Sequence, residues 1–186
     1  MPSTPRGRKP RADAERNRAK VLEAARELFA DRGDDVQMPE VARAAGVGVG
    51  TVYRHFPTRQ ALVEAAAEHR FAEILDFARA QCAGSADGLA RYLRHVGEVL
   101  DVDQGLSASI EAVRRVGGSE RHGQVRERLD AAVAGLVAEG RAAGALRADC
   151  TVSDVHMVVG GLSAIIRLGG DWQRFVEIAL NGLRSR

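Results

Sequence analysis

Apolar residues recur along this chain every three to four positions, which is the period of an α-helix, and no stretch alternates as a half-buried β-strand does. The first such stretch, 14–31, carries its apolar face on Val21, Leu22, Ala25, Leu28 and Phe29. Further helices are predicted at 38–45, 49–56, 59–82, 86–103, 106–116, 119–143, 152–168 and 171–184. The pattern predicts an all-α fold, and the helix from residue 59 is long enough to belong to two domains.

The two short helices at 38–45 and 49–56 are joined by a turn that contains Gly46. This turn is too short for the second helix to fold back antiparallel onto the first, so the two helices must cross. Ala42 permits their close approach, and Gly46 tolerates a positive φ. Val52 fills the angle between them, and Val52 and Phe56 are both assigned to the core. This is the pattern of a helix-turn-helix, whose second helix enters the major groove of DNA.

The run Gly46–Leu62, with the sequence GVGVGTVYRHFPTRQAL, closely resembles the DNA-binding domain of the TetR family of bacterial transcriptional regulators. The match begins near Ala19 and extends to about Ala66, and Tyr53–Pro57 is its most specific part. Beyond it the resemblance is one of length and helical layout, with a short echo at 180–184.

The resemblance implies an N-terminal three-helix DNA-binding domain, joined by a long helix to a C-terminal helical bundle for ligand binding and dimerisation. We expect a flexible basic arm at 1–12, the DNA-binding domain at 13–66 with its motif at about 37–56, and the bundle at 67–186. The implied function is that of a dimeric repressor, released from a near-palindromic operator by an unknown small-molecule effector.

The sequence departs from the family pattern at three places. Asp34 stands where an aromatic or aliphatic residue is usual, and Gln37 and Gly48 replace the Ser or Thr that caps each motif helix. Gln is a poor N-cap, although Pro39 suits a first turn and Glu40 is placed to accept from free amides. These departures affect phosphate contacts from the caps rather than the fold.

The candidate DNA-contacting residues are Arg8, Lys9, Gln37, Val49, Gly50, Thr51, Tyr53, Arg54, His55 and Arg59. Among them, Thr51 and Arg54 are candidates for reading bases or neighbouring phosphates. Val49 and Gly50, at the start of the second motif helix, are candidates for contact with a thymine methyl group or the DNA backbone.

The resemblance assigns phosphate contacts to Tyr53, His55 and Arg59, with Arg59 standing where the family often has lysine. For Tyr53 an alternative is open, in which the ring belongs to the core and only the hydroxyl is exposed. Arg8 and Lys9 would act as a minor-groove or phosphate tether, and the alternative is a merely solubilising tail.

The net charge of +2 conceals an asymmetry between the two ends of the chain. Residues 1–20 carry seven basic and two acidic side chains, whereas 71–186 carry fourteen basic and fifteen acidic ones. A basic end on a near-neutral body favours a polyanion partner for that end. A second interpretation is therefore a helical interaction module whose basic arm binds polyanions non-specifically.

Enzyme activity is not expected, because the chain has no nucleophile elbow, P-loop or H-E-x-x-H motif. A helical-bundle enzyme is the least supported alternative. Cys82 and Cys150 lie far apart with no metal-ligand spacing, so neither a zinc site nor a cofactor is expected. The longest mostly apolar stretch, 155–166, is too short to span a bilayer, so we expect a cytoplasmic protein without a membrane partner.

The predicted helix at 152–168 is apolar almost all round, and the last helix adds further apolar residues. By resemblance, the last two helices, about 152–184, form a homodimer seam, and the alternative is a monomeric core. The candidate ligand-binding residues in the middle helices are Tyr92, His95, Ser109, Glu111 and Arg114. Each has an alternative role as a solvated or hydrogen-bonded structural residue.

Overall fold

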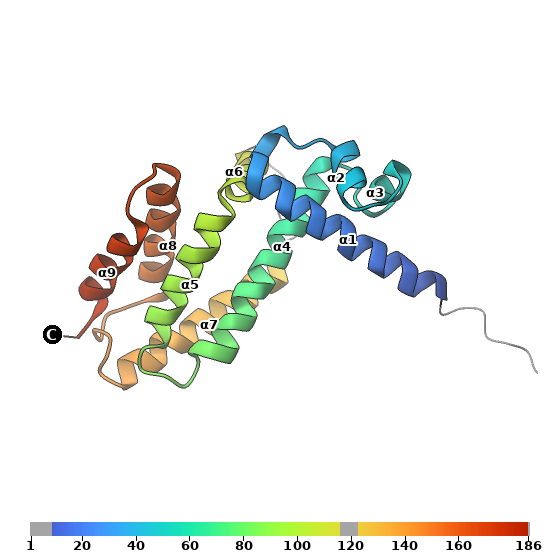
Figure 1. Ribbon diagram of the computed structural model, residues 1–186. Coiled ribbons are helices and arrows are strands. Elements are labelled where there is room, and N and C mark those ends of the chain that lie inside the picture. Colours follow the sequence, from blue (N-terminus) through green and yellow to red (C-terminus); the bar gives the residue numbers. More distant parts are fainter. Residues whose placement is uncertain (1–8, 116–122, 186) are drawn as a thin grey trace, which may run out of the picture. The chain divides into compact units, whose positions relative to one another are not determined.

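A computed structural model describes residues 9–115 and 123–185, except for the side chains at 9–11, 34, 111–115 and 123. Within these residues nine α-helices and two short helical turns form the structure, and a single isolated bridge joins Leu146 to Arg184 (Figure 1). The helices are α1 (Lys9–Arg32), α2 (Met38–Ala44), α3 (Val49–His55), α4 (Arg59–Phe77), α5 (Gly88–Val102), α6 (Gln104–Arg115), α7 (Gly123–Ala142), α8 (Val152–Arg167) and α9 (Trp172–Leu183). The turns are η1 (Gly33–Asp35) and η2 (Ala78–Cys82), the latter a π-helical continuation of α4. The predicted all-α fold is confirmed.

The largest difference from the predicted helix bounds is at α1, which begins at Lys9 rather than at residue 14. Residues 9–12 of the predicted arm are thus helical. Pro10 is tolerated there because the first helical turn has no internal partner for its missing N–H, and the residues that follow include three alanines. Residues 1–8 lie outside the described part of the chain.

The described chain divides into two compact units. The first contains the residues up to Ala67 together with α6, and the second contains the remaining described residues. Helix α4 therefore contributes to both units, as its length predicts. The place of α6 in the first unit was not predicted, because the sequence between α5 and α7 carries no signal of where that helix packs.

The first unit is built on α1, which packs against α2 and α3, while α2 and α3 pack against each other. Val21, Phe29, Val41, Val52 and Leu62 are fully buried between these helices and the start of α4. Gly46 adopts a φ of +65° in the motif turn, as predicted.

The second unit has one continuous core, formed by the second half of α4 together with α5, α7, α8 and α9. Helix α8 begins with a capping box, in which the Thr151 hydroxyl accepts from the Asp154 N–H and the Asp154 carboxylate accepts from the Thr151 N–H at 2.8 Å. Asp171 caps α9 by accepting from the Arg174 N–H at 2.8 Å. No helix among the described residues is long and apolar enough to cross a membrane.

Candidate nucleic-acid interface

Helix α3 has one face in the core and the opposite face in solvent. Val52 is fully buried and Phe56, directly after the helix, is 2% exposed, as predicted. Val49 and Tyr53 are 41% and 46% exposed. The Tyr53 ring is therefore outside the core, and the alternative that buries it is wrong. Because Val49 and Tyr53 are four positions apart, their exposed side chains lie on the same face of α3.

Arg54 lies along the surface of α3. Its Nε donates to the Gly50 carbonyl at 3.1 Å, and its Nη2 donates to the Thr51 hydroxyl at 3.3 Å. Guanidinium carries five N–H donors, so donors remain for an acceptor outside the helix. The structure thus brings together the two residues proposed to read bases and holds the longer side chain against its own helix.

Gly50 has no reason within the described protein to be glycine, whereas Gly48 is the N-cap of α3, where glycine is common. Neither has a positive φ, and a Cβ at either position would meet no atom within 4 Å. Glycine inside a helix is less favourable than alanine by about 1 kcal/mol, and Gly48 gives α3 no side-chain cap. A requirement from outside the chain, such as the close approach of a DNA backbone, is consistent with glycine at position 50.

His55 is half-buried at the end of α3, with its ring centroid 6.4 Å from that of Phe56. The described residues contain no group of three His, Cys, Asp or Glu side chains that could hold a metal ion.

The start of α2 is fastened to the end of α1 through Glu40. Its carboxylate accepts from the Gln37 N–H at 2.9 Å and from Arg32 Nη1 at 2.8 Å. The hydrogen bond from Arg32, followed by that from the Gln37 backbone, holds the pKa of Glu40 below its ordinary value. The prediction that Glu40 satisfies a free amide is confirmed. Gln37 and Glu40 form a capping box at the start of α2, and Gln37 is exposed to solvent.

Arg59 supports the scaffold from the start of α4. Its Nε and Nη2 donate to the carbonyls of Val36 and Gly33 at 3.3 and 3.4 Å, and its guanidinium lies 5.2 Å from the centroid of the Phe29 ring. The side chain is half-buried. These contacts tie α4 to the turn that follows α1, a role that its resemblance to a phosphate-binding position did not suggest.

Two of the side chains predicted to contact DNA are not described by the structure. Arg8 lies outside the described residues, and Lys9 begins α1 with an undescribed side chain. Further along α1, the Arg18 guanidinium lies 5.3 Å from the centroid of the Phe56 ring, which places a basic group beside the end of α3.

The predicted ligand-binding residues have different environments. Tyr92 is in the core of the second unit, where burial raises its pKa, and His95 stacks on Phe77 with ring centroids 3.6 Å apart. Ser109 belongs to the first unit, is fully buried and has an Oγ without a hydrogen-bond partner among the described residues. The side chains of Glu111 and Arg114 are not described.

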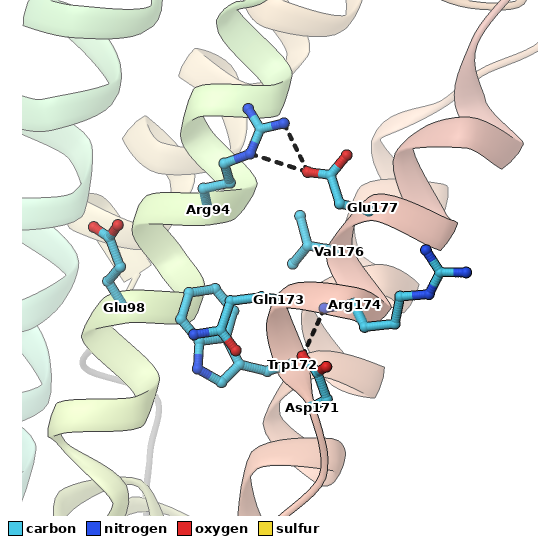
Figure 2. A pocket seen from close by; sticks show the side chains of 8 residues that line it. All are labelled: Arg94, Glu98, Asp171, Trp172, Gln173, Arg174, Val176 and Glu177. Atoms are coloured by element: carbon cyan, nitrogen blue, oxygen red, sulfur yellow. Dashed lines mark hydrogen bonds and ion pairs between the residues drawn. The ribbon is translucent and has the colours of Figure 1, made fainter.

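A pocket of about 510 Å³ lies between α5 and the start of α9 in the second unit (Figure 2). Its lining residues are Arg94, Glu98, Asp171, Trp172, Gln173, Arg174, Val176 and Glu177. Arg94 Nη2 and Nε donate to Glu177 Oε1 at 2.7 and 3.2 Å on one side of it. The Trp172 ring lies so close to Gly97 that a Cβ there would overlap it. Of the predicted ligand-binding residues, the three whose side chains are described, Tyr92, His95 and Ser109, do not line this pocket. Arg94 and Glu177 are 83 positions apart, so no local pattern pairs them.

Comparison with known proteins gives two matches to family models. Residues 21–66 match the bacterial regulatory proteins of the tetR family, and 84–185 match the C-terminal domain of SbtR-like transcriptional regulators. The crystal structure of the TetR transcription regulatory protein from Mycobacterium vanbaalenii is 38% identical, with a TM-score of 0.71 over 94% of this chain and 98% of that one.

Two further relatives match this chain less well, one over a shorter stretch and the other at a lower sequence identity. The HTH-type transcriptional regulator SAR0097 of Staphylococcus aureus (strain MRSA252) is 38% identical over 76 residues, which are 37% of this chain and only 39% of that relative. RolR in complex with resorcinol has a TM-score of 0.62 over 94% of this chain and 91% of its own, at 23% identity, which shows a shared fold alone.

Proposed function

The chain belongs to the TetR family of bacterial transcriptional regulators, which are helix-turn-helix DNA-binding proteins and not enzymes, and we propose that it is a dimeric repressor released from its operator by a small molecule. The observation that carries the DNA-binding part of this proposal is the exposed face of α3. This face presents Val49, Thr51, Tyr53 and Arg54 without a covering element among the described residues.

We assign the contacts by chemistry. Arg54 and Thr51 read base edges in the major groove, where arginine pairs with the acceptors of guanine. Val49 and Gly50 meet a thymine methyl group or the backbone at the start of α3. Tyr53 and His55 bind phosphates.

Four residues outside α3 complete this set. Arg59 is a phosphate contact as well as a scaffold residue, and Gln37 contributes from the start of α2. Arg8 and Lys9 act from the N-terminal end, where the basic side chains are concentrated.

The homodimer is supported by apolar side chains left exposed on the last two helices. Met157 on α8 is 70% exposed and Ile178 on α9 is 56% exposed, and beside them Phe175 and Ala179 are only half-buried. A second copy of the chain would cover this face, because an interface through the same helices in both copies is self-complementary under two-fold symmetry. Two recognition helices then lie about 34 Å apart, one turn of DNA.

The dimer is tested by sedimentation of the double variant Met157→Lys and Ile178→Lys. We expect a monomer of unchanged helical content. Val102→Lys is the matched control, since Val102 is 75% exposed but lies on α5, and this variant should remain dimeric. A wild-type monomer at micromolar concentration, or a dimer that tolerates both lysines, would contradict the proposed seam.

The effector proposal is supported by the pocket between α5 and α9 and by the family. RolR shows that a protein of this fold binds resorcinol in the crystal. The pocket combines the Trp172 ring and Val176 with charged groups of both signs, which suits a small aromatic or amphipathic ligand that carries a polar group. An effector releases DNA only if it binds the DNA-free conformation more tightly than the DNA-bound one.

Trp172 is the only tryptophan in the chain, so its fluorescence reports on this pocket. A panel of small phenols and aromatic acids is titrated against the protein, and compounds that change the emission are then tested for release of bound DNA. We expect Arg94→Ala to weaken the binding of any such compound. A compound that releases DNA without changing the emission of Trp172, and that is insensitive to Arg94→Ala, would place the effector elsewhere.

The experiment that tests DNA binding is selection from random duplexes with the purified protein. A near-palindrome with half-sites about one helical turn apart is expected. Salt-sensitive binding without an enriched sequence would instead favour the alternative of a non-specific polyanion-binding module.

A further inference from the structure

Gly105, the second residue of α6, lies directly against the backbone at the end of α1. A Cβ at this position would overlap the Phe29 carbonyl oxygen, and it would lie 2.9 Å from both the Ala30 carbonyl oxygen and the Gly33 nitrogen. All three neighbours are main-chain atoms, so no change of rotamer relieves the overlap. The approach of α6 to α1 therefore requires glycine at 105.

The other side of this contact is the turn that ends α1. Gly33 has a φ of +54°, a conformation that favours glycine. A Cβ built on Gly33 would lie 3.5 Å from the Cα and the carbonyl oxygen of Gly105. The same turn is held from α4, because Arg59 donates to the Gly33 carbonyl. Helices α4 and α6 thus both fasten the end of α1.

The buried side of α6 contributes to the first unit. Leu106 is fully buried and Ile110 is 6% exposed, while α6 from Gly105 onward groups with the first unit and not with its sequence neighbours α5 and α7. Helix α5 ends at Val102 and α6 begins at Gln104, so the docked helix follows the second unit with almost no intervening loop.

We propose that Gly105 is a positioning residue for DNA binding, which docks α6 on the end of α1 as an additional helix of the DNA-binding unit. Helix α1 packs against both α2 and α3, so the docking of α6 fixes the support on which the recognition helix rests. Displacement of α6 releases the end of α1 and lowers DNA affinity even when the protein is folded. The inference rests on the proposed DNA-binding function for its affinity readout, but not for its structural readout.

The test is Gly105→Ala in the full-length protein, compared with two control glycines in α7. Alanine has a higher helix propensity than glycine, so Gly105→Ala is expected to stabilise the protein if the contact between α6 and the end of α1 is unimportant. In Gly135→Ala the new Cβ meets nothing within 4 Å, which isolates this propensity effect. In Gly140→Ala it would lie 2.6 Å from Leu146 Cδ1, which disturbs the second unit alone.

Two quantities are measured well below the melting temperature: affinity for a selected DNA site, and hydrogen–deuterium exchange of the amides in α6 and the end of α1. Overpacking predicts that Gly105→Ala lowers the melting temperature by roughly 2 to 10 °C and the DNA affinity about tenfold or more. It also predicts faster exchange in both segments. Gly140→Ala should lower the melting temperature with an affinity within about twofold of wild type, and Gly135→Ala should change neither adversely.

Unchanged exchange in α6 and α1, or a gain in stability equal to that of Gly135→Ala, would overturn the proposal. So would an equal loss of DNA affinity in Gly105→Ala and Gly140→Ala, because affinity would then merely follow global stability. If the wild-type protein binds no DNA, the proposed function fails while the exchange measurement still decides whether Gly105 docks α6.

Discussion

Replacing Arg59 with lysine separates two roles that the structure and the family resemblance give to this residue. Lysine keeps the positive charge needed at a phosphate, but it cannot bridge two carbonyls through a planar fork. The bonds to the Val36 and Gly33 carbonyls are long, at 3.3 and 3.4 Å, so each is assigned the low end of the usual net range, about 0.5 kcal/mol. The cation–π contact with Phe29 adds about 0.5 to 1 kcal/mol.

We therefore expect Arg59→Ala to lower the free energy of unfolding by about 1.5 to 2 kcal/mol, and Arg59→Lys to lower it by about 1 kcal/mol, because a lysine ammonium keeps the cation–π contact with Phe29. The assay is urea unfolding, followed by circular dichroism for all helices and by tryptophan fluorescence for the second unit, where Trp172 lies. The unfolding transition seen by circular dichroism should begin at a lower urea concentration than the one seen by tryptophan fluorescence, because Arg59 belongs to the first unit. A variant within about 0.5 kcal/mol of wild type would refute the structural role, since that is the spread of neutral surface substitutions.

The same residue is then tested on DNA. Each phosphate contact contributes about 0.9 to the slope of log affinity against log salt concentration. Arg59→Lys should keep the slope, and Arg59→Ala should reduce it by about 0.9 if the phosphate contact exists. Arg79→Ala is the control, because Arg79 is exposed in the second unit and is not a proposed contact. An unchanged slope in Arg59→Ala would leave Arg59 with its scaffold role alone.

Three further predictions concern the N-cap of α8, the loss of stability at acid pH and the reactivity of the two thiols. Thr151→Ala removes the capping box of α8 and should lower the free energy of unfolding by about 0.5 to 2 kcal/mol in urea titration, and Thr151→Ser should restore most of it; equal stability of wild type and Thr151→Ala would contradict the cap. The pKa values of Glu40 and Asp154 are lowered in the folded protein, by Arg32 and Thr151 first, so their stabilisation is present above the ordinary pKa values of 4.5 and 3.8 and is lost as pH falls through the folded values. Melting temperatures of Glu40→Gln should thus depend less on pH between about 5 and 3 than those of wild type, and parallel curves would refute this. Burial raises the pKa of both Cys82 and Cys150, so neither thiol should react with a disulfide reagent at pH 8 until urea unfolds the chain, and rapid native-state labelling would contradict their burial.

The sequence predicted the features that depend on local chemistry. Helix periodicity placed the nine α-helices within a few residues, and the turn at Gly46 required only that glycine tolerate a positive φ. The burial of Val52 and Phe56 followed from the same period. These features are encoded by residues close together in the chain.

Long-range contacts were not predictable in this way. The bond between Arg94 and Glu177 joins residues 83 positions apart, and the docking of Gly105 on Phe29 joins helices whose sequences show no complementary pattern. Arg59 illustrates a further limit, since its guanidinium binds backbone carbonyls whose positions are fixed only by the fold. Tyr92 and His95, predicted to line a ligand pocket, pack in or against the core of the second unit, a placement that their residue types do not reveal.

The most direct test of sequence-specific recognition by α3 is the ratio of affinities for a selected operator and for a scrambled duplex of equal length, measured at about 0.15 M salt. Specific regulators prefer their sites by about 10³-fold or more, and loss of one base contact costs about 1 to 3 kcal/mol. We expect wild type to show such a ratio and Arg54→Ala to lower it by about 5- to 150-fold, while binding to the scrambled duplex changes little. A ratio near one for the wild-type protein, or a ratio that Arg54→Ala leaves unchanged, would contradict the assignment of base reading to this helix.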